Sequence, residues 1–370
     1  MIMKREKKVE VIVMLVVFTL VVFSANSALA SIGGSCVSCH TMHNSQDGAN
    51  MLRDSDSMTP NSALLRASSC LGCHGDSTVA NGAWSPDFIS PQVTAPAGQE
   101  LAGGSFYWVM ITGGNADAKG HNVMGIAEED TALGLTPPGW NNSFTDHENG
   151  RIANGAATWT DQLTCAGTVG CHGKHEAGGI AIDDMFAAIN GGHHDESVLG
   201  YRMLNGIEGF EDDDWEWTKD ANDHNQYKGS DGTTEDKTTI SYLCAECHGA
   251  FHTASDVDET GSASWLRHPS DFDMNTLAST SEYFSYNGGT GSANPYSVVA
   301  PVASTDVSAV KGTVFNASGD AIVTCISCHR PHGSENDDLL RWAYNVTDTL
   351  MAAGSGAGNV GCFICHTTKN

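Results

Sequence analysis

The stretch Cys325-Ile-Ser-Cys328-His329 contains the pattern around which the whole sequence is organised, two cysteines separated by two residues and followed at once by histidine. Four further copies occur along the chain, and a sixth copy differs only in having five residues between its cysteines. Together the six motifs use all twelve cysteines. The other motifs consist of Cys36, Cys39 and His40; Cys70, Cys73 and His74; Cys165, Cys171 and His172; Cys244, Cys247 and His248; and Cys362, Cys365 and His366.

These motifs predict covalently bound haem. In the C-x-x-C-H pattern the two thiols bond to the porphyrin and the adjacent histidine binds its iron. A disulfide framework or zinc sites would also use paired cysteines, but neither explains a histidine directly after every pair. We therefore predict six haem c groups, each with one proximal histidine from its own motif. For the widened motif, Cys165 to Cys171, a disulfide beside an unused histidine is the alternative.

The N-terminus has the three parts of a secretory signal peptide. Residues 1–8 are basic, residues 11–23 are apolar apart from Thr19, and Ala-Leu-Ala at residues 28–30 is a small-residue cleavage site. An uncleaved membrane anchor is the alternative, but the apolar run is shorter than the roughly 20 residues of a spanning helix. We predict a cleaved signal peptide at residues 1–30, a single hexahaem domain at residues 31–370, and no transmembrane segment after cleavage.

The composition predicts little regular secondary structure. The sequence contains 41 glycines and few long periodic segments, so side chains alone would bury little apolar surface. We predict a multihaem cytochrome c that is mostly coil, with short helices and a few short strands wrapped around a stacked chain of haems. A helical turn is expected at residues 339–346, and strands are expected at residues 106–112 and 307–315. Since the porphyrins would supply the core, the haem-free polypeptide is expected to be largely unfolded.

Histidines outside the motifs can supply a second ligand to every iron. The sequence has sixteen histidines, so ten remain besides the six in the motifs. His43, His175 and His332 follow a motif histidine by three residues, and His252 follows one by four. A histidine so close in sequence cannot reach the opposite face of its own haem, but it can reach a haem stacked alongside. This spacing therefore predicts closely packed haems, the arrangement that electron hopping requires.

Further segments occur in a characteristic order, and these are Cys36-Val-Ser-Cys-His-Thr-Met-His-Asn-Ser, Ser68-Ser-Cys-Leu-Gly-Cys-His, Lys119-Gly-His-Asn, Tyr201-Arg-Met-Leu, Leu266-Arg-His-Pro, Cys325-Ile-Ser-Cys-His-Arg-Pro-His and Trp342-Ala-Tyr. In this order they resemble the OmcS-type hexahaem cytochromes of metal-respiring bacteria, which polymerise into extracellular nanowires. The resemblance extends from Ser35 to the last motif and is weak in the loops. The third motif of those relatives is regular, so the resemblance does not fix the placement of the haem at Cys165 and Cys171.

By this resemblance six histidines are the distal iron ligands, namely His43, His121, His175, His252, His268 and His332. In the family, the second histidine of the first C-H-x-x-H segment binds the haem of the fifth motif in the next subunit. Transferred to this chain, His43 would bind the haem held by Cys325 and Cys328 of a neighbouring copy. The implied partner is the chain itself, in a head-to-tail homopolymer. The remaining histidines have no counterpart and are expected at the surface, and these are His147, His193, His194 and His224.

The chain is strongly acidic. Its formal charge is −26, and removal of the four basic and two acidic residues of the signal peptide leaves −28. This charge argues against nucleic-acid binding. It would keep the protein soluble and attract basic redox partners or metal cations. Besides a second copy, the expected partners are therefore other redox proteins and extracellular acceptors such as metal oxides.

Together these features favour an electron conduit over an enzyme. We predict long-range electron transfer through six bis-histidine haems, polymerised into a conductive filament that is exported through the periplasm and secreted to the outer cell surface. A monomeric exported or periplasmic carrier is the alternative. A multihaem reductase is disfavoured because such enzymes need an iron with an open position, commonly beside a lysine-ligated haem, and the sequence has no C-x-x-C-K motif.

Overall fold

The computed structural model of the chain describes residues 36–52, 64–72, 74, 101–110, 116–175, 185–191, 198–231, 235–252, 270–344 and 361–367. Two compact units, Met1–Ser31 and Ile32–Asn370, divide the chain, and every described residue belongs to the second. Several predictions therefore fall outside the described residues: the signal peptide and its cleavage site, Cys73 of the second motif, the distal ligand His268, and the histidines His193 and His194.

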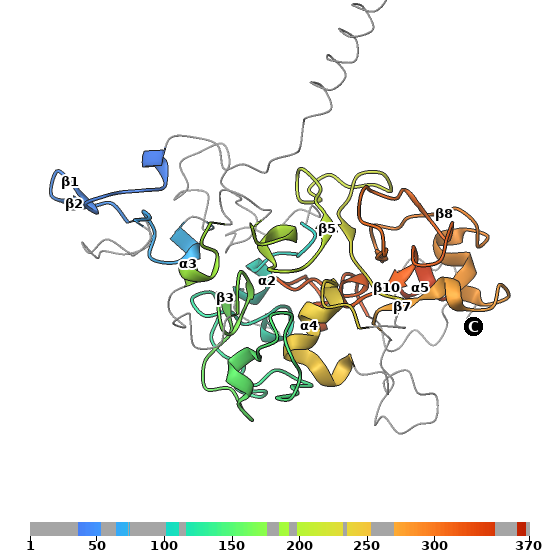
Figure 1. The fold of residues 1–370 in the computed structure, drawn as a ribbon, viewed down its shortest axis with the longest axis horizontal. Helices are drawn as coiled ribbons and strands as arrows, with labels where there is room; N and C mark the ends of the chain where they lie inside the picture. Colours follow the sequence, from blue (N-terminus) through green and yellow to red (C-terminus); the bar gives the residue numbers. More distant parts are fainter. Residues whose placement is uncertain are drawn as a thin grey trace, which may run out of the picture. The chain divides into compact units, whose positions relative to one another are not determined.

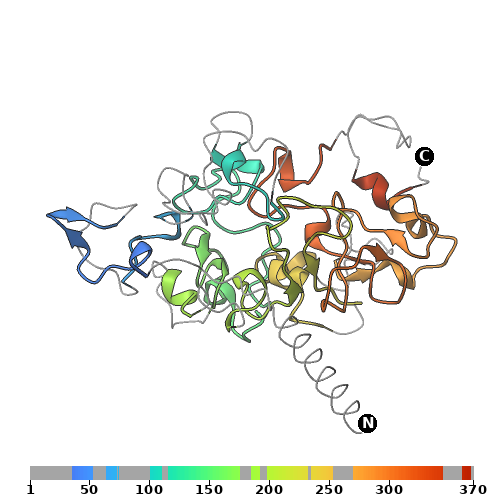
Figure 2. The ribbon, with the colours of Figure 1, turned by 90° about the horizontal axis from the view of Figure 1, so that it is seen from above.

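Regular secondary structure is short and alternates with long irregular segments (Figures 1 and 2). The α-helices among the described residues are α2 (Tyr107–Met110), α3 (Met185–Ala188), α4 (Ile240–His248) and α5 (Cys362–Cys365). The 3-10 helices are η1 (Cys36–Ser38), η2 (Cys70–Gly72), η3 (Ala116–Ala118), η4 (Ile152–Gly155), η6 (Tyr201–Met203), η7 (Gly249–Phe251), η9 (Met274–Thr276), η10 (Glu282–Gly288), η11 (Cys325–Ser327) and η12 (Asp337–Leu339). None of the helices in this part of the chain has the length and apolar composition of a membrane span.

The strands pair only two at a time within the described residues. Antiparallel pairs are formed by β1 (Ser45–Gln46) with β2 (Ala49–Asn50), β5 (Gly209–Phe210) with β6 (Gln226–Tyr227), β7 (Phe272–Asp273) with β10 (Ile322–Val323), and β8 (Asn294–Pro295) with β9 (Thr313–Val314). The remaining pair, β3 (Thr164–Ala166) with β4 (Gly170–His172), is parallel. These short elements confirm the predicted fold, which is mostly coil with short helices and a few short strands.

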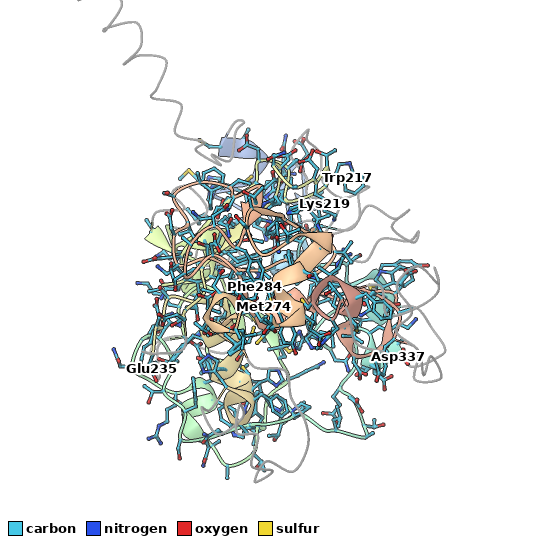
Figure 3. The ribbon with its side chains drawn as sticks, turned by 90° about the vertical axis from the view of Figure 1, so that its right-hand side faces the viewer. Trp217, Lys219, Glu235, Met274, Phe284 and Asp337 are labelled. Atoms are coloured by element: carbon cyan, nitrogen blue, oxygen red, sulfur yellow. The ribbon has the colours of Figure 1, made fainter. Side chains whose placement is uncertain are left out.

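The apolar core is divided into several small clusters instead of one layer. One cluster gathers Met274, Tyr286 and Phe315 with four further buried residues, and Phe284 packs against it; Figure 3 labels Met274 and Phe284. Four of the clusters have a motif cysteine packed at their edge, and these cysteines are Cys165, Cys171, Cys247 and Cys365. The protein core therefore stops at the cysteines that are expected to hold the haems.

Three local predictions are corrected by the structure. Residues 107–110 form helix α2 instead of a strand, because one helical turn places Phe106 and Val109 together in a buried cluster with Val123. The strand expected at residues 307–315 is reduced to β9, since Asp306 accepts hydrogen bonds from Ser308 and binds Lys311 in a turn. The helical turn expected at residues 339–346 ends at Leu339, and residues 340–344 are not helical.

Candidate haem sites

Five of the six motifs lie on a single helical turn. The turns are η1, η2, η11 and α5, and the fourth motif forms the end of α4. In four of them the amide of the motif histidine donates to the carbonyl oxygen of the first cysteine, over 2.8 Å in the first motif, 2.7 Å in the second, 3.1 Å in the fifth and 2.8 Å in the sixth. Residues three and four apart on a helical turn share one face. In the helical motifs whose cysteines and histidine are all described, both thiols and the imidazole can therefore approach one porphyrin from the same side.

The third motif is built on two strands instead of a helical turn, and these strands also bring its cysteines and histidine together. Strands β3 and β4 run parallel and pair Ala166 with His172, while the Gly170 amide donates to the carbonyl oxygen of Gly167 over 2.9 Å. A side chain at Gly170 would not fit, because its Cβ would lie 2.5 Å from the carbonyl carbon of Ala166. The segment between these cysteines has five residues instead of two, and it thus forms a compact loop that turns the chain back. As a result Cys171 lies within electrostatic reach of Cys165.

Replacing Gly170 with alanine is expected to disturb the third motif specifically. The new methyl group must push β3 and β4 apart, which we expect to cost about 1–3 kcal/mol of unfolding free energy and to shift His172 away from its iron. Denaturant unfolding measures the first effect and the low-spin absorption spectrum the second. The control Gly134→Ala, where no atom lies within 4 Å of the new Cβ, should lose stability only. An unchanged midpoint with an unchanged spectrum would contradict this account of the loop.

Cysteines of successive motifs meet in space in the order in which they occur along the chain. Cys70 of the second motif shares a hydrogen bond with Cys165 of the third. Cys244 of the fourth motif interacts with Cys171 of the third and shares a hydrogen bond with Cys325 of the fifth. The fifth and sixth motifs have thiols within electrostatic reach of one another, and these are Cys328, Cys362 and Cys365. The fold therefore brings the second to sixth motifs side by side.

The first motif is held next to the second by hydrogen bonds of the main chain. The amide of Thr41 donates to Leu64 and the amide of Arg66 donates to Cys39, both over 2.7 Å. The Arg66 guanidinium also donates to the carbonyl oxygens of Val37 (3.2 Å) and Met51 (3.3 Å). Residues 36–52 are thereby folded back onto the segment that leads directly into η2.

The motif thiols are desolvated by the surrounding fold but are not fully buried. Burial raises the pKa of Cys171, Cys328 and Cys365 to about 12 in each case. Nevertheless the nine described cysteines from Cys70 onward are all partly exposed, and no disulfide joins any described cysteine. Thiols that are desolvated yet still accessible suit the attachment of a bulky apolar group. The donor set fits haem.

Four of the predicted iron ligands have the nitrogen Nδ1 fixed by a main-chain carbonyl oxygen. The partners are Pro331 for His121 (2.7 Å), Arg202 for His172 (3.2 Å), Pro138 for His248 (2.7 Å) and Asp338 for His329 (2.8 Å). A carbonyl oxygen only accepts, so the ring proton is on Nδ1 and the lone pair is on Nε2. Histidine ligands of metals commonly have their second nitrogen held in this way. Burial also lowers the pKa of His248 to about 4, which keeps its ring neutral.

Two pairs of histidine rings have the separation expected of ligands on opposite sides of one iron. The ring centroids of His121 and His248 are 6.2 Å apart, and those of His172 and His332 are 6.1 Å apart. Two imidazoles that each bind one metal at about 2 Å through Nε2 have centroids about 6 Å apart. Each pair joins one motif histidine to one predicted distal histidine. The structure thus brings proximal and distal candidates together at two of the six motifs.

His332 illustrates how the fold positions such a ligand. Its ring stacks on Phe106 with centroids 4.7 Å apart, and its amide donates to the carbonyl oxygen of Gly103 over 2.8 Å. A Cβ on Gly103 would approach Nδ1 of His332 to 3.0 Å, so glycine leaves the space that the ring occupies. Burial lowers the pKa of His332 to about 3. The ring is therefore neutral and can donate its lone pair to a metal.

The other predicted ligands have different surroundings. His43 is exposed directly before the β1–β2 hairpin, and His40 and His74 are partly buried. His366 places Nδ1 3.2 Å from the Glu282 carboxylate. His252 has Nε2, instead of Nδ1, directed at Asp271 over 3.1 Å. The last predicted ligand, His175, is 1% exposed and packs against the carboxylate of Glu246.

Two histidines that were expected at the surface are buried. His224 is wholly buried and stacks on Tyr296 with ring centroids 3.6 Å apart. The side chain of His147 is 5% exposed, and its Nδ1 lies 2.6 Å from Glu246. The expectation of exposure was wrong because both rings use polar partners inside the fold. Glu246, at a variable position of the fourth motif, carries no sequence signal that would mark it as their partner.

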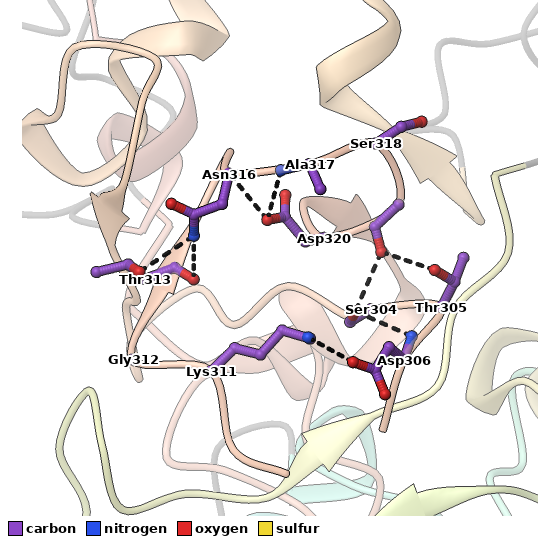
Figure 4. Close-up of a pocket in the computed structure, with 11 residues that line it drawn as sticks. Ser304, Thr305, Asp306, Lys311, Gly312, Thr313, Asn316, Ala317, Ser318 and Asp320 are labelled. Atoms are coloured by element: carbon purple, nitrogen blue, oxygen red, sulfur yellow. Dashed lines mark hydrogen bonds and ion pairs between the residues drawn. The ribbon is translucent and has the colours of Figure 1, made fainter. Parts of the chain in front are cut away.

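A surface pocket is formed by a part of the chain that contains no predicted haem residue (Figure 4). It has a volume of about 360 Å³ and is lined by residues between Ser304 and Asp320. Its charged groups already have partners, since Asp320 accepts hydrogen bonds from the amides of Phe315 and Asn316, and Lys311 binds Asp306 over 2.9 Å. The pocket contains none of the predicted haem residues, and its polar groups stabilise the local loop.

Comparisons with known proteins agree with the motif pattern. The family model for the doubled CXXCH motif matches residues 317–370. The C-type cytochrome OmcS of Geobacter sulfurreducens is 27% identical over 397 residues, covering 90% of this chain and 85% of that protein. These matches confirm the resemblance to OmcS-type cytochromes and support haem c as the cofactor.

Two solved structures are also similar to this chain. The "Outer Membrane Cytochrome S Filament from Geobacter Sulfurreducens" is 22% identical with a TM-score of 0.45 and covers 84% of each chain. The structure described as "Cryo-EM of the OmcS nanowires from Geobacter sulfurreducens" is 25% identical with a TM-score of 0.41, and covers 84% of this chain and 83% of that one.

Proposed function

We propose that this chain, as an OmcS-type c-type cytochrome, holds six haems in one continuous row and conducts electrons along that row outside the cell. The observation that carries the proposal is the order of the cysteines, because the thiols of the second to sixth motifs lie within hydrogen-bonding or electrostatic reach of one another in the same order as in sequence. Adjacent attachment points imply adjacent porphyrins. Electrons that enter at one end of such a row can hop to the other without leaving the protein.

In this proposal each haem is attached by the two cysteines of its motif and bound by the motif histidine. The distal ligands are His43, His121, His175, His252, His268 and His332. The ring separations support two of the pairings directly, His121 with the haem of His248 and His332 with the haem of His172. The widened motif is included, because its loop returns Cys171 to Cys165.

The protein's part in electron transfer is to fix the ligands and keep them unchanged during the reaction. Haem supplies an iron that exchanges one electron. The main-chain carbonyl oxygens at Nδ1 of His121, His248 and His329 fix each ring in one tautomer and one orientation. Since both axial positions would be filled by imidazole, no position remains for a substrate. This arrangement suits electron transfer instead of catalysis.

Polymerisation through His43 extends the row from one copy to the next. His43 is exposed beside Met42, which is 75% exposed, and Val37 in the same N-terminal segment is 64% exposed. A segment that exposes two apolar side chains together with a potential iron ligand suits an arm that docks on a second copy. The solved structures named above are described as a filament and as nanowires. We propose that His43 of one copy contacts the haem held by Cys325 and Cys328 of the next copy.

We propose that this activity lies outside the cell, and the predicted secretory signal supports this location. A surface with a formal charge of −28 after signal removal attracts metal cations and basic redox proteins. We therefore propose extracellular acceptors such as metal oxides, reached from filaments at the outer surface. An exported monomeric carrier would use the same haems and differ only in lacking the contact made by His43.

Intact-protein mass spectrometry of protein sheared from the producing cells tests the haem count. We expect a mass equal to the chain from Ser31 plus six haems, and an absorption spectrum that carbon monoxide does not change. Carbon monoxide binding by the untreated protein would reveal an open iron and support the reductase alternative. A mass with five haems would contradict the count of six, and a haem-free peptide containing Cys165 and Cys171 would identify the widened motif as the one without a haem.

A further inference from the structure

Residues 36–52, here called the N-terminal arm, form a surface unit that takes no part in the apolar core. His43 and the hairpin residues 45–49 are exposed. None of the apolar clusters of the described core contains a residue of the arm. A surface segment without core packing is usually among the least stable parts of a fold. The order of this arm therefore depends on its hydrogen bonds.

Hydrogen bonds close the arm on itself around His43. Strands β1 and β2 are joined by residues 47–48, an Asp-Gly pair in which both residues have the positive φ that a type I′ hairpin turn requires. Directly after His43, the amide of Asn44 donates to Oγ1 of Thr41 over 3.1 Å. The carbonyl oxygen of Asn44 accepts the amide of Met51 over 3.2 Å. The main chain that follows His43 is thereby held in one conformation.

Arg66 links the two ends of the arm, although it lies outside the arm in the sequence. Its Nη1 donates to the carbonyl oxygen of Val37 over 3.2 Å, and its Nε donates to that of Met51 over 3.3 Å. The main chain places Arg66 there, because its amide donates to the carbonyl oxygen of Cys39 over 2.7 Å. The donors of a guanidinium form a rigid planar fork, so one side chain can hold two carbonyl oxygens in a fixed relation. The arm is thus closed by the hairpin turn at one end and by Arg66 at the other.

We propose that Arg66 is a positioning residue for the contact between copies: it keeps the arm closed before docking, so that His43 meets the second copy already in its binding orientation. This inference rests on the proposed contact of His43 with the haem of a neighbouring copy. A segment that becomes ordered only on binding loses conformational entropy at that step, which lowers the affinity. Arg66 removes this loss in advance and therefore strengthens association from within the subunit.

The alternative is that the contacts of Arg66 serve only the haem of the first motif, to which Val37 and Cys39 belong. The two roles predict different results. Loss of a purely structural residue changes the first haem even in a dilute, unassembled subunit. Loss of a positioning residue leaves that haem as it is and changes the concentration at which subunits associate. Haem spectra and assembly therefore have to be measured on the same variant.

The test measures assembly of the holoprotein by sedimentation over a series of concentrations. Arg66→Met removes both hydrogen bonds of the charged donor and keeps an apolar stem. We expect the concentration of half-assembly to rise about tenfold, with six haems by mass and an unchanged spectrum of the dilute subunit. Arg66→Lys keeps the charge but lacks the planar fork, so its half-assembly concentration should rise as well. The control Arg151→Met removes the charge of an exposed arginine outside the arm and should assemble like the wild type.

A mixing experiment shows which side of the contact is affected. Arg66→Met keeps the cysteines and histidine of its fifth motif, so it should still accept His43 of a wild-type copy. Its own arm then adds poorly to a further copy. We therefore expect Arg66→Met, added as a minor component, to shorten wild-type filaments in electron micrographs. A variant that was misfolded as a whole would not be incorporated and would leave their length unchanged.

Four results would overturn the role of Arg66. An unchanged half-assembly concentration in Arg66→Met would show that the closed arm does not depend on this side chain. Wild-type assembly by Arg66→Lys would show that only the charge matters. A lost or altered haem in dilute Arg66→Met would assign the residue to the first haem. Unchanged length of the mixed filaments would contradict a defect confined to the arm.

The variant His43→Ala separates this inference from the proposed function. If His43→Ala assembles like the wild type, the proposed contact fails, and the role of Arg66 fails with it. If His43→Ala stays dispersed while Arg66→Met assembles like the wild type, the contact stands and only the role of Arg66 fails. If both variants are dispersed at low concentration and a higher concentration restores filaments only in Arg66→Met, the ligand role of His43 and the positioning role of Arg66 are both supported.

Discussion

Replacement of His43 with alanine is expected to abolish filament formation while the subunit retains all its covalent haems. The cysteines that are proposed to attach the haems are unchanged, but in our proposal the fifth-motif iron of the neighbouring copy loses its second ligand. We expect discrete monomers in electron micrographs, and one iron per subunit that binds carbon monoxide. The exposure of His43 next to β1 supports this expectation, because the side chain is accessible to a second copy.

The neighbouring variant Met42→Ala is the control for the docking surface. Met42 is 75% exposed and is not among the predicted iron ligands. Its loss should weaken the contact between copies without opening an iron. Filaments of His43→Ala with six low-spin haems would show that copies associate by another route. Monomeric wild-type protein would instead favour the exported carrier.

Production of residues 31–370 without haem attachment is expected to yield an unfolded chain. The described core is divided into small clusters, and four of them end at a motif cysteine. The longest described α-helix, α4, has nine residues, and isolated helices of that length are marginal in water. We expect the loss of essentially all folding stability, roughly 5–15 kcal/mol for a typical domain.

Circular dichroism during heating measures this loss. The haem-free chain should show no cooperative thermal transition, and its amides should exchange rapidly with solvent. The same chain with haem attached is the control and should unfold cooperatively. A cooperative transition in the haem-free chain would show that the polypeptide alone specifies the fold, contrary to the structural role assigned to the porphyrins.

The motifs allowed the fold class to be predicted, because the chemistry of haem attachment requires fixed residues at fixed spacing, and the attachment points stay a prediction from the same motifs. The local elements were less predictable. Residues 107–110 are apolar and β-branched in part, but they form α2 because Phe106 and Val109 must face the same cluster. The packing of Phe106 and Val109 against Val123 favours the helix, and the sequence of residues 106–112 alone does not reveal this contact.

The ligand environment shows the same limit. His147 and Glu246 are 99 residues apart, and only the fold brings them together. The pairing of His121 with His248 likewise depends on carbonyl oxygens of Pro331 and Pro138, which any residue type could supply. Sequence can identify candidate histidines, since the side chain itself would be the ligand. It cannot identify partners that act through the main chain or through a carboxylate at a variable position.

Electron cryo-microscopy of material sheared from the producing cells tests the central claim most directly. The account predicts a filament in which each subunit holds six haems in sequence order, with the imidazole of His43 bound to the haem at Cys325 and Cys328 of the next subunit. It also predicts His121 and His248 on opposite sides of one iron. Haems in an order that does not follow the motifs, or an iron with an open axial position inside the row, would contradict the continuous conduit.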